Sequence, residues 1–175
     1  MKARWLAGLM IGMAGVASSQ MDYFAFIPEG GRSLLQTLLA DDPELAAELT
    51  ETRPAAEWLG AISRGDLRGA KDLDEWQART LADYLAYAAP VDPAALLPDG
   101  RDMTLDRCQS CHIITVVVTQ ARAKEAWLGT LGKPSHVGVP LTEAERDQLA
   151  DYLTVNAGIP IDAIPPELRA GGASY

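Results

Sequence analysis

Hydrophobic positions along this chain recur at helical intervals. Leu149 and Leu153 are four residues apart, which is the spacing that places side chains on one face of a helix. Thr142, with Glu145 three positions later, has the capping-box pattern that starts a helix just before these leucines. The one run of residues that looks like a strand is short and covers positions 113–118. The pattern therefore predicts a mostly α fold.

The helical pattern occurs twice. Segments 57–90 and 126–160 both begin with Trp-Leu-Gly and both contain Leu-Ala-Asp-Tyr-Leu, with a leucine at the same distance before it. Upstream of these blocks, identical residues match at a constant offset of 69 positions: Gly31-Arg32 with Gly100-Arg101, Thr50 with Thr119, and Arg53 with Arg122. Chance rarely places shared blocks in register with such single matches. We therefore expect two tandem copies of one helical unit, at residues 28–92 and 98–160, followed by an extended tail over 161–175.

The N-terminus has the pattern of a secretory signal peptide. Two basic residues, Lys2 and Arg4, precede an apolar run over positions 5–16, and small residues follow it. The pattern predicts a signal peptide at residues 1–19, because the apolar run is short for a membrane span. An uncleaved anchor is the alternative. We expect an exported, periplasmic protein whose mature chain has no transmembrane span.

The charge of the chain limits its partners. The formal net charge is −9 and the sequence pI is about 4.6. Binding to nucleic acid requires a basic surface that neutralises phosphates, so nucleic acid is excluded as a partner. An acidic protein of this kind is suited to docking on positively charged surfaces.

The rarest reactive side chains lie within five consecutive positions. Cys108, Cys111 and His112 include both cysteines and one of the two histidines of the chain. The Cys-x-x-Cys-His spacing is the signature of covalent c-type haem attachment, in which two thiols bind the haem and the histidine binds its iron. A structural disulfide is a weak explanation, because it would close only a very short loop. In the first copy the corresponding residues, 39–43, are Leu-Ala-Asp-Asp-Pro, so only the second copy contains this chemistry.

With these features in this order, residues 98–160 resemble the class I cytochrome c family. The resemblance depends on the pentapeptide near the start of the unit, on Trp127, and on the terminal helix that follows. It implies that Cys108 and Cys111 are the thioether anchors of one haem c and that His112 is the proximal iron ligand. The first copy then looks like a cytochrome c-like unit that has no haem. The end of the chain is similar to the small cytochrome subunits of periplasmic dehydrogenases.

The sixth iron ligand is where the chain departs from this family. The family usually supplies a methionine before the last helix, but no methionine follows Met103. His136 is the only later histidine, in a loop between proline residues, so we expect coordination by His112 and His136. A solvated loop histidine is the alternative interpretation, and a deprotonated Lys133 could also supply the ligand. A second imidazole in place of methionine predicts a lower haem potential.

Two further features are expected to lie near the haem. Arg122 could stabilise a haem propionate, but its counterpart Arg53 persists where no haem is expected, so a structural role is favoured. The apolar side chains at 113–118 would shield the haem from water, or belong to the general core.

These features predict an electron-transfer protein rather than an enzyme. Its partner would be a larger oxidoreductase, such as a periplasmic dehydrogenase or a subunit of a respiratory complex. The main alternative is a haem sensor or small haem enzyme with an open or displaceable sixth ligand. Two other interpretations remain: zinc bound by Cys108, Cys111 and His136, with or without His112, and thiol–disulfide exchange by the two cysteines.

Overall fold

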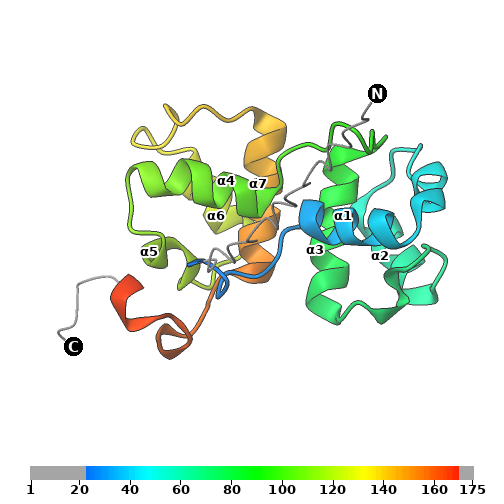
Figure 1. Ribbon diagram of the computed structural model, residues 1–175. Helices are drawn as coiled ribbons and strands as arrows, with labels where there is room; N and C mark the ends of the chain where they lie inside the picture. The colour runs from blue at the N-terminus through cyan, green and yellow to red at the C-terminus, as the bar shows by residue number, and fades with distance from the viewer. Residues whose placement is uncertain (1–22, 170–175) are drawn as a thin grey trace, which may run out of the picture.

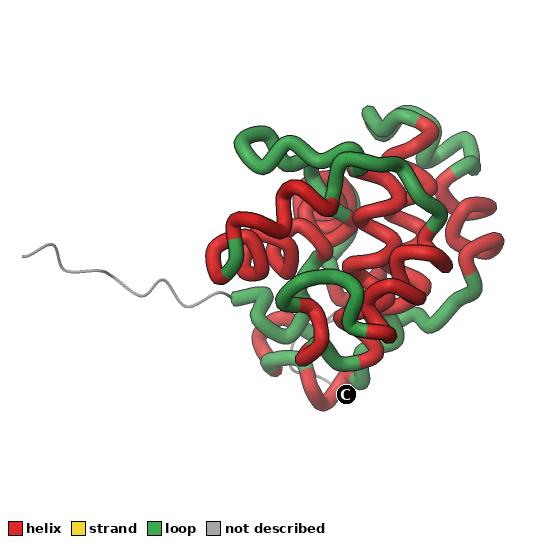
Figure 2. The backbone as a smooth tube through the Cα atoms, turned by 90° about the vertical axis from the view of Figure 1, so that its right-hand side faces the viewer, coloured by secondary structure: helices red, strands yellow, loops and turns green. Residues whose placement is uncertain are grey.

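The computed structural model describes residues 23–169. Helices make up 59% of these residues and no strand occurs among them, so the prediction of a mostly α fold is confirmed (Figure 2). The signal peptide predicted at 1–19 and the last six residues of the chain lie outside the described residues. In the strand-like run at 113–118, Thr115 to Val118 form a helix. The backbone amides of this run donate to carbonyls three or four residues earlier, and no strand occurs within residues 23–169 with which the run could pair.

The helices repeat in their positions as well as in their sequence. Their bounds are α1 (Gly31–Asp41), α2 (Ala55–Arg64), α3 (Glu75–Ala88), α4 (Gly100–Arg107), α5 (Thr115–Val118), α6 (Lys124–Leu131) and α7 (Glu143–Asn156). Short 3-10 helices are η1 (Pro43–Glu48), η2 (Ala70–Asp72), η3 (Cys108–Ser110), η4 (Ile161–Ala163) and η5 (Pro166–Leu168). The helices α1 and α2 begin 69 residues before α4 and α6, and α3 begins 68 residues before α7. The predicted extended tail thus differs from the structure, which has two single helical turns there.

The capping residues explain where the last helix of each set begins. The Thr142 side chain accepts a hydrogen bond from the Glu145 amide, and the Glu145 side chain accepts one from Thr142 in return. Asp74 and Gln77 form the same capping box at the start of α3. Both capping boxes satisfy amides that the first turn of a helix leaves without partners. The capping-box start predicted for the helix after Thr142 is therefore confirmed.

Two apolar clusters form the core. We refer to residues 31–88 as the N-terminal half and to residues 100–156 as the C-terminal half, and each contains one cluster. The two halves lie side by side, with α3 packed against α7 between them (Figure 1). Phe24, Phe26 and Ile27 precede the N-terminal half in the sequence but pack on the cluster of the C-terminal half. The chain therefore contacts the C-terminal half before it enters the N-terminal half.

The same side-chain contacts hold both halves together. Gly31 in α1 packs so closely on Tyr84 in α3 that a Cβ atom at position 31 would have no room. Gly100 in α4 packs on Tyr152 in α7 in the same way. A close helix crossing of this kind requires a residue without a side chain at the contact point. The identical residues in the two copies thus make identical contacts.

Hydrogen bonds between the halves follow a reciprocal pattern. The Tyr84 hydroxyl donates to the carbonyl of Leu97, just before the C-terminal half, at 2.9 Å. The Tyr152 hydroxyl donates to the carbonyl of Pro28, just before the N-terminal half, at 2.6 Å. Each tyrosine thus binds the segment that leads into the other half. A direct hydrogen bond joins the two halves, from Asn156 Nδ2 in α7 to Thr80 Oγ1 in α3 at 2.9 Å, and another side of α7 lines a cavity.

Within residues 23–169, no helix combines the length and the apolar character that crossing a bilayer would require.

Candidate functional site

A cavity of about 400 Å³ lies in the C-terminal half. Its floor and walls are largely apolar and come from α5, α6 and α7, with Val117, Leu131, Leu149 and Leu153 among them. Largely apolar walls are typical of sites that bind small molecules or cofactors. The cavity opens where η3 meets the loop at residues 132–141, which we call the distal loop.

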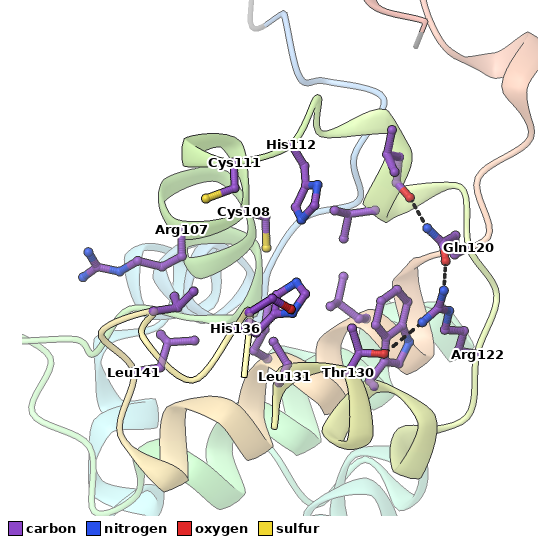
Figure 3. A pocket seen from close by; sticks show the side chains of 17 residues that line it. Arg107, Cys108, Cys111, His112, Gln120, Arg122, Thr130, Leu131, His136 and Leu141 are labelled. Carbon is purple, nitrogen blue, oxygen red and sulfur yellow. Dashed lines mark hydrogen bonds between the residues drawn. The ribbon is translucent and has the colours of Figure 1, made fainter. Parts of the chain in front are cut away.

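The structure brings all four predicted site residues to this cavity. Cys108, Cys111, His112 and His136 all line it. The rings of His112 and His136 face each other from opposite sides of the opening, with centroids 5.9 Å apart and planes inclined by 20° (Figure 3). The histidines come from positions 24 residues apart in the sequence. The fold thus brings two imidazoles from distant parts of the sequence together at one cavity.

The backbone of the pentapeptide explains how three of these residues gather. The amides of Cys111 and His112 both donate to the carbonyl of Cys108, at 3.3 and 3.0 Å. This turn follows α4 directly and points the Cys108 sulfur into the space below His112, as Figure 3 shows. Cys108 is half-buried, whereas Cys111 and His112 are exposed. The two thiols therefore lie at different depths along one side of the opening.

Both cysteines are free thiols. Burial raises the pKa of Cys108 to about 11, and the neighbouring Cys111 adds to this shift. Thiols that take part in disulfide exchange have a lowered pKa, because the thiolate is the attacking species. The shift at Cys108 has the opposite direction, so the site does not support the thiol-exchange interpretation.

His136 lies in the middle of the distal loop. Its amide donates to the carbonyl of Lys133 at 2.8 Å, and its ring Nδ1 is hydrogen-bonded to the Ser135 hydroxyl at 3.0 Å. A hydrogen bond at Nδ1 leaves Nε2 as the nitrogen available to a metal. Lys133 itself is exposed and is not one of the described residues that line the cavity. The geometry therefore favours His136 over Lys133 as the second ligand.

Arg146 is a site residue that the sequence analysis missed. From α7 its guanidinium donates to the carbonyls of Leu131, Val137 and Val139, on both sides of His136. Every residue has a backbone carbonyl, so the residue types that accept these hydrogen bonds cannot be recognised in the sequence. The role of Arg146 therefore has no direct sequence signature. An indirect signal exists, because the corresponding residue of the first copy is Ala78.

Arg122 has a structural role that both halves share. Its guanidinium lies over the Trp127 ring at 5.0 Å and donates to Thr130 Oγ1 at 3.0 Å. In the N-terminal half Arg53 lies over Trp58 at 4.8 Å. The common stacking supports the structural interpretation of Arg122, although this side chain also lines the cavity.

In the N-terminal half, several leucines are buried at positions that correspond to the segments around the cavity. Leu45 and Leu49 are fully buried, and they correspond to Ile114 and Val118 of the C-terminal half. Leu67, which corresponds to His136 at the 69-residue offset, is also buried. A smaller, more polar hollow of about 260 Å³ lies beside Trp58. The two halves thus share their helix contacts and differ at the position of the cavity.

Within residues 23–169, no three or more histidine, cysteine, aspartate or glutamate side chains group closely enough to hold a metal ion. A zinc site needs three or four such ligands. A group that brings its own metal requires only two axial ligands from the protein.

No family model matches the chain, and no curated protein or solved structure matches it. The functional argument therefore depends on the site and on the repeat.

Proposed function

We propose that this protein is an exported c-type cytochrome that transfers single electrons through one haem c attached to its C-terminal half. The observation that carries the proposal is the facing pair of His112 and His136 across a cavity lined by both cysteines. Cys108 and Cys111 would form the thioether bonds, and His112 and His136 would bind the iron from its two sides. The bound haem supplies a one-electron iron couple.

The distance between the imidazoles fits two iron–nitrogen bonds. A bond from a metal to an imidazole nitrogen is about 2 Å long, so the two nitrogens would lie about 4 Å apart. Each ring centre lies about 1 Å beyond its nitrogen, which brings the expected separation of the centres to about 6 Å. The observed separation is 5.9 Å.

The walls of the cavity suit a haem that exchanges electrons. Apolar side chains on α5, α6 and α7 keep water from the porphyrin plane, and water exclusion and axial ligation are two means by which a protein tunes haem potential. Val116, which lines the cavity, is exposed, as are Ile113 and Val137, which adjoin His112 and His136 in the sequence. They provide an apolar edge at which a redox partner can approach closely.

The repeated contacts support an origin from two tandem cytochrome c-like units. The glycine–tyrosine and arginine–tryptophan contacts recur in both halves, at residues 28–92 and 98–160. The N-terminal half has no cysteine or histidine with which to attach a haem or bind its iron. That half then serves as a support for α7 and as a surface for docking.

Electron transfer is favoured over catalysis, because two protein ligands would leave the iron no open position for a substrate. The partner would be a periplasmic dehydrogenase or a subunit of a respiratory complex. The periplasmic location depends on the signal peptide predicted at residues 1–19.

One observation favours the alternative of a haem sensor or small haem enzyme. His136 belongs to a surface loop rather than to a helix, so its displacement would open the iron. The two functions differ in how firmly the distal loop is held.

Spectra of the purified full-length protein test the proposal directly. We expect a coloured protein with the mass of one covalently bound haem, and a low-spin spectrum of bis-histidine type by absorption and electron paramagnetic resonance. A colourless protein with the mass of the bare polypeptide would refute the proposed function. A high-spin spectrum would favour the sensor alternative.

A further inference from the structure

We infer that Arg146 is the positioning residue that holds the distal loop closed and thereby keeps His136 at the iron. This inference rests on the proposed function, in which His136 is the second axial ligand. Arg146 then determines whether the site stays closed for electron transfer or opens to bind an external ligand.

The hydrogen bonds of Arg146 span the whole loop. Its Nη1 donates to the carbonyl of Leu131, the last residue of α6, at 3.0 Å. Its Nη2 donates to the carbonyls of Val139 and Val137, at 2.8 and 3.2 Å. The first of these residues precedes His136 and the other two follow it. One guanidinium therefore connects both arms of the loop to α7.

An arginine is well suited to this task. Its planar guanidinium directs several N–H donors in a fixed fork, so it can bind carbonyls on two sides at once. The carbonyl of Leu131 is one of those that the end of a helix leaves without an internal partner. The negative end of the α6 dipole adds an attraction for the positive charge of Arg146.

The rest of the loop has little else to hold it. Its backbone hydrogen bonds join residues no more than four positions apart, as in the bond from the Val139 amide to the His136 carbonyl at 3.0 Å. Lys133, Ser135 and Gly138 are exposed. Segments with few buried contacts and only local hydrogen bonds open with a low free energy. Leu141 packs on the apolar cluster at the end of the loop, and Arg146 is the side chain that bonds the backbone on both sides of His136 to α7.

The N-terminal half solves the same problem differently. There the segment between α2 and α3 is anchored by the buried side chains of Leu67 and Ala70, and Ala78 takes the place of Arg146. The half without the histidine has buried apolar anchors and ion pairs of Arg68 with Glu44 and Glu48, whereas the half with the histidine has a polar clamp on its backbone carbonyls. A polar clamp holds the backbone and leaves the His136 side chain free to turn toward the cavity.

Four variants of the full-length protein test the inference. Arg146→Gln removes the charge and the fork, Arg146→Lys keeps the charge alone, and His136→Ala opens the site fully. Arg79→Gln is the matched control, because Arg79 is a surface arginine on α3 whose side chain bonds Glu75 within its own helix. If Arg146→Gln does not accumulate as a folded protein, Arg146→Lys provides the test.

The first measurement is the rate at which carbon monoxide binds the reduced protein. We expect a rate about tenfold higher or more in Arg146→Gln, the factor that loss of one hydrogen bond to a charged group would produce. Arg146→Lys should fall between Arg146→Gln and the unaltered protein, and Arg79→Gln should match the unaltered protein. A rate in Arg146→Gln within twofold of the unaltered protein would overturn the inference.

The second measurement is hydrogen–deuterium exchange of the peptide that covers residues 132–141, which requires no haem. We expect faster exchange there in Arg146→Gln, with the peptides of α3 unchanged. Equal exchange in this peptide, or equally raised exchange over the whole chain, would contradict a local clamp. If the unaltered protein binds carbon monoxide as fast as His136→Ala does, the proposed ligation fails, and the exchange measurement still decides the role of Arg146.

Discussion

The imidazole of His112 faces that of His136 at 5.9 Å, although the two residues belong to a helical turn and a surface loop. The turn is fixed by its own backbone hydrogen bonds after α4. The loop is fixed by Arg146. The pair therefore combines an imidazole in a turn with its own backbone hydrogen bonds and an imidazole in a loop that is bonded by a residue outside the cavity lining.

Replacing His136 should change the iron rather than the fold. His136→Met restores the ligand type that raises haem potential, so we expect a higher midpoint potential than in the unaltered protein. Redox titration of both proteins measures the difference. Lys133→Ala is the control, because Lys133 neighbours the same turn but lies outside the cavity. An equal shift in both variants would indicate that the loop, and not the ligand, sets the potential.

The two cysteines should each contribute one covalent bond to the haem. In Cys108→Ala or Cys111→Ala the haem should remain attached through the other thioether, and in the double variant acidified acetone should extract it. The readout is simple, because the chain contains only these two cysteines. Haem that stays bound to the denatured double variant would disprove thioether attachment.

The glycine–tyrosine contact predicts a loss of stability. Gly100→Ala forces a methyl group into Tyr152, and overpacking of this kind costs about 1–3 kcal/mol. Gly129→Ala is the matched control in α6, where an added Cβ would meet no atom within 4 Å. Alanine there should stabilise the helix by up to about 1 kcal/mol. Thermal unfolding followed by circular dichroism should thus shift in opposite directions for the two variants.

A half-buried carboxyl on α3 makes stability depend on pH. Burial raises the pKa of Asp83 from 3.8 to about 6, and the nearby Asp151 adds to this shift. Between these values the folded state binds more protons than the unfolded state, so the contribution of Asp83 to stability is lost as the pH rises from about 4 to 6.

Asp83→Asn keeps the side chain neutral at every pH. Because Asp83 is partly exposed, we expect a gain of only about 1 kcal/mol at pH 7, after allowance for screening by solvent. Near pH 4 the variant and the unaltered protein should unfold at the same denaturant concentration. A gain that is equal at both pH values would mean that packing, and not charge, is responsible.

Much of the fold could be predicted from the sequence, because the helices are specified by local signals. Capping at Thr142, the leucine spacing of α7 and the repeated blocks depend on residues close together in the chain. The run at 113–118 was harder to predict, since branched residues favour strands only where another strand is available for pairing. In this helical environment it forms α5 instead.

The gathering of the four site residues was predictable in part. The pentapeptide places Cys108, Cys111 and His112 on one turn by its spacing alone. The approach of His136 depends on Arg146, whose partners are backbone carbonyls and could be of any residue type. The pKa of Asp83 depends likewise on the packing of α3 against α7, which repeats in a sequence do not specify.

The segment from Phe24 to Pro28 is synthesised before either half, yet it packs on the half that is synthesised last. Its carbonyls cannot meet Arg101 and Tyr152 until ribosomes have made nearly the whole chain. A nascent chain that stops after the first copy would therefore leave this apolar segment without the surface on which it packs.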